Sequence, residues 1–266
     1  MRAYNHIDQE NEPCLRCLFS PDYAIDQGCK PMTAMDLSPK SIKDFREWVH
    51  AGKLTLLTQN ETQSKLARKC FGEAAKIMRV GLWTVDWPKT FGLNVCEDDR
   101  NEFDVVFHAA EHPAKGFLWT LEVAKLCPEL TFLFPSQKPS FVNDDSIPIN
   151  ATFKPMSWES GLESEVAKAK LVLVPSLWSA PIEGALIKSI MQARATAVID
   201  LETNFGSELE GIVLRLSTKP EEAAVSLCDA VRNKWRPNQE RLIAWEKEFR
   251  KTNEKLLSNI YRALDD

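Results

Sequence analysis

The residues of this 266-residue chain best placed to do chemistry lie in one loop and the helix expected after it. An apolar run at residues 170–174 ends at Pro175-Ser176, and the helix is expected to open at Glu183-Gly184. Loops that leave the carboxyl ends of parallel strands are where α/β sheets bind ligands. The free N–H groups of a helix start attract anions, typically phosphate. The stretch therefore predicts a nucleotide-type ligand, to which Ser176 would offer a hydroxyl and Gly184 a close backbone approach.

A second set of polar residues follows an earlier apolar run at residues 103–110. Lys115-Gly116 ends the loop after this run, and His108 and His112 flank it. A lysine ammonium here could neutralise a diphosphate, and a histidine could donate a hydrogen bond to it. A solvated lysine at a turn and a structural histidine at a strand end are the ordinary alternatives.

Two residues of the 182–193 helix are also candidates. Glu183 could bind sugar or ribose hydroxyls, or its charge could simply suit the positive end of the helix dipole. Lys188, about one turn further along, could contact phosphate or point to solvent. The sequence leaves both pairs of alternatives open.

The first forty residues hold a third candidate site. One CxxC pair and two flanking residues form a set with the types and spacing of a tetrahedral zinc site: His6, Cys14, Cys17 and Cys29. A single CxxC is a weak signal, and free cysteines are common buried residues. We therefore expect no metal as a cofactor, and the zinc site remains the less favoured alternative.

Short apolar runs alternate with amphipathic stretches from residue 53 onward. The runs predict strands at residues 53–59, 74–83, 103–110, 130–136, 151–156, 170–176, 196–200 and 212–217. The stretches between them predict helices at residues 61–72, 117–127, 158–169, 182–193 and 219–234, and a last charged helix at 237–266. Nearly continuous apolar strands that alternate with helices are typical of a parallel sheet covered on both faces. The predicted fold is α/β, a doubly wound parallel sheet.

Composition narrows the function class. With 44% hydrophobic and 27% charged residues the chain is typical of a globular protein, and its net charge of −5 argues against nucleic acid as the main partner. No run is long enough to cross a bilayer, and residues 1–14 lack the apolar segment of a secretory signal. With seven cysteines and no signal, a cytoplasmic location is expected. No GxGxxG or GxxxxGK[ST] motif is present.

The order of these elements and motifs resembles the C-terminal half of retaining GT-B glycosyltransferases of the glycosyl transferases group 1 type. The match runs over about residues 50–266. It implies a GT-B-like Rossmann-type domain that binds a nucleotide-sugar donor, with Lys115-Gly116 at the diphosphate and Pro175-Ser176 and Glu183 at the donor site. It also implies a hexosyltransferase-type activity without a cofactor.

Three departures from the family pattern stand beside this resemblance. In the ungapped match, the family's pair of donor-binding glutamates falls at Ala180 and Lys188, and its diphosphate-binding arginine falls at Ala110. The Gly-rich loop that begins the family's N-terminal domain is absent from the sequence. The resemblance thus implies a shortened N-terminal unit, and a partner protein that supplies the missing half is conceivable.

The combined prediction divides the chain into three parts: a small N-terminal, acceptor-side unit at 1–95, a nucleotide-sugar-binding domain at 96–240, and a helix at 241–266 that packs back on the first unit. The predicted function is glycosyl transfer from a nucleotide sugar to an unidentified glycan-type acceptor. One alternative is a non-catalytic GT-B-like binding or assembly protein that has lost the donor-site acids. Another is a sugar-nucleotide or phosphate-binding enzyme of a different doubly wound type.

Overall fold

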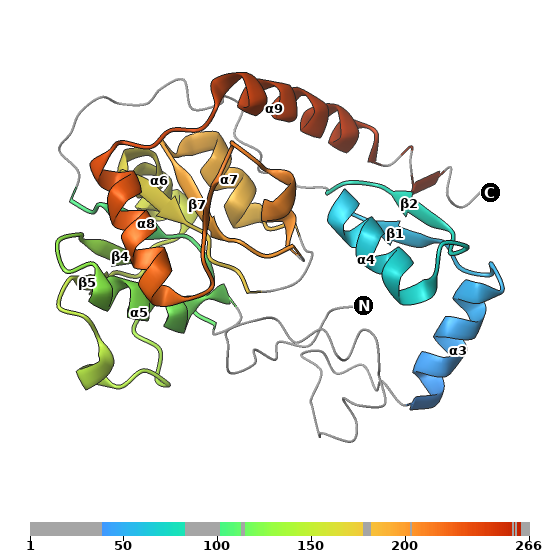
Figure 1. The fold of residues 1–266 in the computed structure, drawn as a ribbon, viewed down its shortest axis with the longest axis horizontal. Coiled ribbons are helices and arrows are strands. Elements are labelled where there is room, and N and C mark those ends of the chain that lie inside the picture. The colour runs from blue at the N-terminus through green and yellow to red at the C-terminus, as the bar shows by residue number, and fades with distance from the viewer. Residues whose placement is uncertain are drawn as a thin grey trace.

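The computed structural model describes residues 39–82, 102–112, 115–177, 182–202, 204–256, 258 and 260–261 (Figure 1). The predicted zinc ligands lie outside the described residues, as does most of the predicted boundary at 87–102. The division at residues 95 and 240 therefore stays a prediction.

Six parallel strands form the main sheet, in the spatial order β5-β4-β3-β6-β7-β8. The strands are β3 (Val105–Phe107), β4 (Phe132–Phe134), β5 (Ala151–Phe153), β6 (Leu171–Leu173), β7 (Thr196–Ile199) and β8 (Leu214–Leu216). Each corresponds to one predicted apolar run. The predicted parallel arrangement is confirmed.

Helices cover both faces of this sheet (Figure 1). On one face α5 (Phe117–Leu126) packs on α8 (Pro220–Arg232), and on the other α6 (Glu163–Lys168) packs on α7 (Gly184–Gln192). Successive strand side chains point to opposite faces, so the two cores share each strand. In β3, Val105 and Phe107 belong to the core under α5 and α8, and Val106 belongs to the core under α6 and α7. This double burial explains the continuous apolar runs.

The large part of the molecule comprises this sheet and the helices on its two faces, within residues 102–232. Its described residues also form three short helical turns. They are η2 (Asp144–Ser146), η3 (Trp158–Leu162), which is a π-type turn, and η4 (Phe205–Glu208). The predicted 158–169 helix is thus divided, because Gly161 has φ 123° and interrupts the helical backbone between η3 and α6. None of the described helices is long and apolar enough to cross a membrane.

The smaller part contains a two-stranded parallel sheet and two helices. They are α3 (Pro39–His50), β1 (Leu56–Thr58), α4 (Glu61–Phe71) and β2 (Ile77–Arg79). The sequence predicts both strands and α4 but not α3. The sequence of α3 is short and only weakly apolar, so it does not by itself predict a helix. Val49 of α3 is fully buried, so packing against the rest of the protein stabilises this helix.

Helix α9 (Gln239–Glu254) links the two parts (Figure 1). Leu242, Trp245 and Phe249 pack against the core under α6 and α7. Further along, Asn253 Oδ1 accepts a hydrogen bond from the Leu82 backbone N–H at 2.9 Å. The helix thus contacts the large part at its start and the smaller part near its end.

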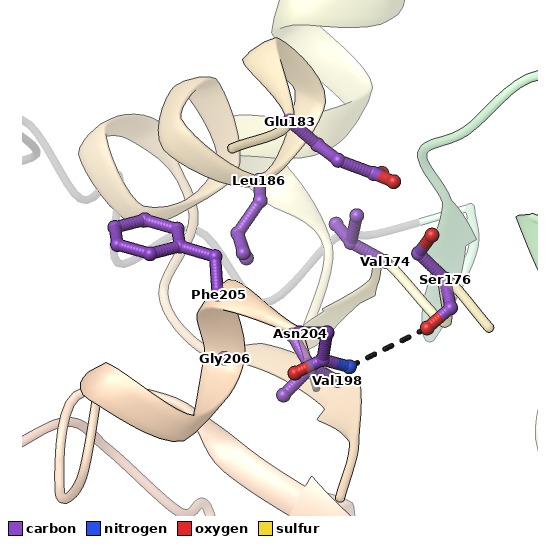
Figure 2. A pocket seen from close by; sticks show the side chains of 8 residues that line it. All are labelled: Val174, Ser176, Glu183, Leu186, Val198, Asn204, Phe205 and Gly206. Atoms are coloured by element: carbon purple, nitrogen blue, oxygen red, sulfur yellow. Dashed lines mark hydrogen bonds between the residues drawn. The ribbon is translucent and has the colours of Figure 1, made fainter. Parts of the chain in front are cut away.

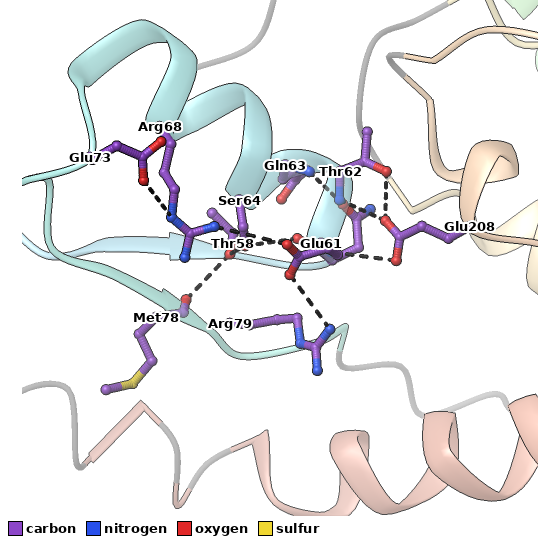
Figure 3. A network of polar contacts seen from close by, with 11 residues as sticks. Thr58, Glu61, Thr62, Gln63, Ser64, Arg68, Glu73, Met78, Arg79 and Glu208 are labelled. Atoms are coloured by element: carbon purple, nitrogen blue, oxygen red, sulfur yellow. Dashed lines mark hydrogen bonds and ion pairs between the residues drawn. The ribbon is translucent and has the colours of Figure 1, made fainter.

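A second link joins η4 to the start of α4 (Figure 3). One Glu208 carboxylate oxygen accepts hydrogen bonds from the Thr62 N–H at 2.7 Å and the Thr62 hydroxyl at 2.6 Å. The other faces the Glu61 N–H at 3.4 Å, and Asn60 accepts from Gln63 N–H as the helix cap. An acid supplied by the large part therefore satisfies the first N–H groups of α4, where a negative charge also suits the helix dipole.

We expect Glu208→Gln to weaken this link, because it removes the charge and one acceptor oxygen from the α4 N-terminus. The loss should be about 1 kcal/mol, and faster amide hydrogen exchange should be confined to α4 and β1. Glu210→Gln is the matched control, since Glu210 is two residues away and exposed. Equal exchange in the two variants would show that Glu208 does not hold the parts together.

Candidate functional site

The strand order locates the candidate site. The chain runs from β3 outward through β4 to β5, and then returns to place β6 on the other side of β3. The order therefore reverses between β3 and β6, and open α/β sheets bind ligands in the crevice at the carboxyl ends of such a pair. The two motifs singled out in the sequence, Lys115-Gly116 and Pro175-Ser176, follow β3 and β6.

These two motifs are in contact. Gly116 precedes the first residue of α5 with φ 73°, and a Cβ on it would lie 2.0 Å from the Pro175 carbonyl oxygen and 2.9 Å from the Pro175 ring. Residue 116 must therefore be glycine for two reasons, its left-handed backbone and the space it leaves. The contact brings Lys115 to the loop that leads to α7.

The Lys115 ammonium forms an ion pair with the Glu183 carboxylate. Their Nζ and Oε1 atoms are 2.5 Å apart, and the side chains are 17% and 10% exposed. Glu183 stands just before the first residue of α7, but its side chain makes no capping bond to that helix. The two predicted catalytic residues are thus joined directly, 68 residues apart in the chain. Partial burial strengthens the Coulomb attraction between the two charges, because less water screens it.

Ser176, Gly184 and His112 lie around this pair. Ser176 is buried at the end of β6, and Gly184 is the first residue of α7 with open space where a side chain would stand. The His112 carbonyl accepts a hydrogen bond from the Lys115 N–H at 2.9 Å, so His112 shapes the turn that carries the lysine. Ala180, the position matched to the family's first acid, lies outside the described residues.

His108 is buried at the end of β3 and has a defined proton position. Its Nδ1 lies 2.8 Å from the Ser189 hydroxyl oxygen, and that hydroxyl donates its own hydrogen to the Ala185 carbonyl at 2.8 Å. Nδ1 must therefore donate to Ser189, which leaves Nε2 as the unprotonated nitrogen. Burial, with a smaller effect from the nearby Lys188 charge, lowers the pKa of His108 to about 4. The ring is neutral at physiological pH, so it brings no positive charge to a phosphate.

Lys188 lies over an aromatic ring. Its Nζ is 4.7 Å from the centroid of Trp158, a distance typical of a cation–π contact. The same indole stacks on His108, with ring centroids 5.3 Å apart. The structure thus brings Lys188 and His108 together through Trp158, on the α7 side of the sheet, and does not join Lys188 to the Lys115–Glu183 pair.

Sequence reasoning missed Trp158 and Asn204. Asn204 is buried beside Ser176, to whose carbonyl oxygen its amide donates over 3.5 Å, and it lines a small hollow with Glu183 (Figure 2). Each residue follows the carboxyl end of a strand, β5 and β7, and that position was the available signal. Within the described ranges no group of three or more His, Cys, Asp or Glu residues could hold a metal ion.

Gly116→Ala should destabilise the protein by roughly 2–5 kcal/mol, since it adds left-handed strain and a clash with the Pro175 backbone. Urea denaturation measures the change. Gly184→Ala is the matched control: it places a methyl group in open space in a helix, so stability should stay equal or rise slightly. Equal stability of both variants would refute the close approach.

His108 should make the free energy of unfolding depend on pH between about pH 6.5 and pH 4. Its folded pKa of about 4 lies below its unfolded value of 6.5, so the contribution is fully present above pH 6.5 and is lost as the pH falls towards 4. The total loss should be about 3 kcal/mol. Urea denaturation from pH 7 to 4.5 should show that His108→Gln removes this part of the slope. His50→Gln, at an exposed position, should keep it, and a slope unchanged by His108→Gln would contradict the assignment.

Comparisons with known proteins give no match by sequence. No protein-family model matches the chain, and no curated protein matches it.

Solved structures do match. HepE from Anabaena, in complex with UDP, superposes with a TM-score of 0.62 at 12% identity, over 94% of this chain and 77% of HepE. Sucrose-phosphate synthase from Thermosynechococcus elongatus gives 0.61 at 12% identity, over 88% of this chain and 64% of the synthase. TarM from S. aureus gives 0.57 at 14% identity, over 89% of this chain and 49% of TarM. The chain thus spans about half the length of TarM and under two thirds of the synthase.

These proteins are GT-B glycosyltransferases. At such low identities the likeness concerns the fold, and it agrees with the parallel six-stranded sheet and the order of its strands. The described part of the chain therefore has the fold of the GT-B glycosyltransferases.

Proposed function

We propose that this protein is a glycosyltransferase of the hexosyl type that takes its sugar from a nucleotide-sugar donor. The observation that carries the proposal is the partly buried Lys115–Glu183 pair, set where the strand order reverses and beside the first turn of α7. HepE, which shares the fold, is known in complexes with UDP and with UDP-glucose. UDP-glucose is therefore the first donor to test.

The proposed reaction needs charge neutralisation at the leaving diphosphate. In the transfer, the bond between the sugar C1 and the diphosphate oxygen breaks, and negative charge grows on the leaving diphosphate. An acceptor hydroxyl oxygen bonds to C1 and gives its proton to that diphosphate. An ammonium has three N–H donors, so Lys115 can keep its bond to Glu183 and still donate to that diphosphate. The first N–H groups of α7 favour the same charge. Glu183 holds the ammonium in position.

The same ion pair also favours a second candidate function, that of a non-catalytic binding or assembly protein. Glu183 already neutralises Lys115, and the sequence has an alanine and a lysine at the two positions matched to the family's acids. A binding or assembly protein with this fold could keep the pair for stability alone. Nucleotide binding separates the candidates, because a pair kept only for stability does not need to recognise a diphosphate.

The test is UDP binding by calorimetry and transfer from UDP-glucose, measured on the wild type and on Lys115→Ala. The variant loses a contact that strengthens as the diphosphate gains charge, so turnover should fall roughly a hundredfold, about 2–3 kcal/mol, and UDP should bind more weakly.

Lys170→Ala is the matched control. Lys170 forms a comparable pair with Asp104 (2.6 Å) at the opposite end of the same two strands, β3 and β6. This variant should keep both UDP binding and turnover. The diphosphate role is wrong if Lys115→Ala binds UDP as the wild type does, and the binding-protein candidate gains if the wild type binds no nucleotide or sugar nucleotide.

A further inference from the structure

Two neighbouring residues of α7, Lys188 and Ser189, are each held by a side chain from outside the helix. The Ser189 hydroxyl oxygen accepts a hydrogen bond from His108 Nδ1 at 2.8 Å, and Ser189 is fully buried. The Lys188 ammonium lies 4.7 Å from the centroid of the Trp158 ring. His108 and Trp158 in turn stack on each other, with an angle of 13° between their planes. These four side chains form one connected cluster, the α7 clamp.

The two residues that hold α7 are themselves well anchored. His108 follows β3, is 7% exposed, and donates its backbone N–H to the Leu173 carbonyl of β6 at 2.9 Å. Trp158 is the first residue of the η3 turn after β5, and its indole packs against the core under α6 and α7. The clamp therefore joins α7 to the carboxyl ends of β3 and β5, which the sheet holds in place.

The clamp also reaches the first turn of α7. The Ser189 hydroxyl donates its hydrogen to the Ala185 carbonyl at 2.8 Å, one turn nearer the start of the helix. Apolar packing of the helix on the core has no preferred direction, whereas a hydrogen bond tolerates only a narrow range of length and angle. The bond from His108 to Ser189 therefore restricts sliding and rotation of α7, and with them the positions of the N–H groups at its start.

The start of α7 lies beside the Lys115 ammonium, because Glu183 directly precedes the helix and is bonded to that lysine. We propose that His108 and Ser189 are positioning residues for the donor: their hydrogen bond, supported by the stack of His108 on Trp158, fixes the start of α7 where its first N–H groups meet the diphosphate. The proposal rests on the proposed function and deepens it, since it names the contact that aligns the helix with the diphosphate.

The test compares UDP with uridine on the wild type and on Ser189→Ala, by NMR titration, which also reports weak binding. Without the hydroxyl, His108 has no acceptor and the start of α7 loses its tie to β3. The affinity for UDP should fall about fivefold, which corresponds to the usual effect of a charge at a helix N-terminus. The affinity for uridine, which carries no phosphate, should not change, whereas a merely structural loss would weaken both ligands or neither.

Ser64→Ala is the matched control. Ser64 is also a buried helix serine, and its hydroxyl donates to the carbonyl four residues earlier, that of Asn60, at 3.0 Å. Its oxygen lies 2.8 Å from the Thr58 hydroxyl oxygen at the end of β1. The variant removes the same kind of contact from α4, in the smaller part, and should leave the affinities for UDP and uridine unchanged.

A second pair of variants serves as the test if thermal denaturation shows that Ser189→Ala does not fold. His108→Asn places an amide N–H near the position of Nδ1 and can still donate to Ser189, whereas His108→Leu cannot. Both remove the stack on Trp158, so the difference between them reports the hydrogen bond. His108→Asn should bind UDP about fivefold more tightly than His108→Leu, with equal affinities for uridine, and equal affinities for UDP would reject the proposal.

The outcomes separate this inference from the proposed function. A wild type that binds neither UDP nor UDP-glucose would defeat both. A wild type that binds UDP, with a Ser189→Ala variant that binds UDP equally well or weakens uridine as much as UDP, would keep the proposed function and reject the positioning role.

Discussion

The contact of Gly116 with Pro175 is the constraint on which the rest of the site depends. Parallel strands β3 and β6 place two loops at one edge of the sheet, but they do not by themselves make the loops touch. A residue without a side chain, in a left-handed conformation, lets the start of α5 approach the Pro175 carbonyl. That approach sets Lys115 within reach of Glu183, and the ion pair then fixes the start of α7 against the loop after β3.

The charged and titratable side chains around this contact differ in their surroundings. Lys115 and Glu183 neutralise each other, and His108 stays neutral because burial lowers its pKa to about 4. Lys188 is held over Trp158 on the α7 side. In the proposed transfer, the ammonium of Lys115 and the N–H groups of α7 are the described groups that would stabilise the negative charge growing on the diphosphate.

The segment 204–208 serves both parts of the molecule. At its start Asn204 lines the hollow beside Glu183, and at its end Glu208 caps α4 of the smaller part. These five residues therefore connect the hollow beside Glu183 with the smaller part. Asn253 of α9 makes the other link, at Leu82. A change at either link is expected to alter how the smaller part sits over the carboxyl edge of the sheet.

The sequence by itself determined the class of fold, because strands buried on both faces must be apolar throughout and the helices between them must be amphipathic. It also indicated Lys115 and Glu183, since each begins or precedes a helix after such a strand. Tertiary structure alone decided that these two side chains pair, across 68 residues, and that Glu208 caps α4, across 146. The amide direction of Asn204 depends on two carbonyls from other segments. Local sequence patterns do not reveal hydrogen-bond or ion-pair partners that are distant in the chain. Such partners are determined by the positions that distant segments take in the folded protein.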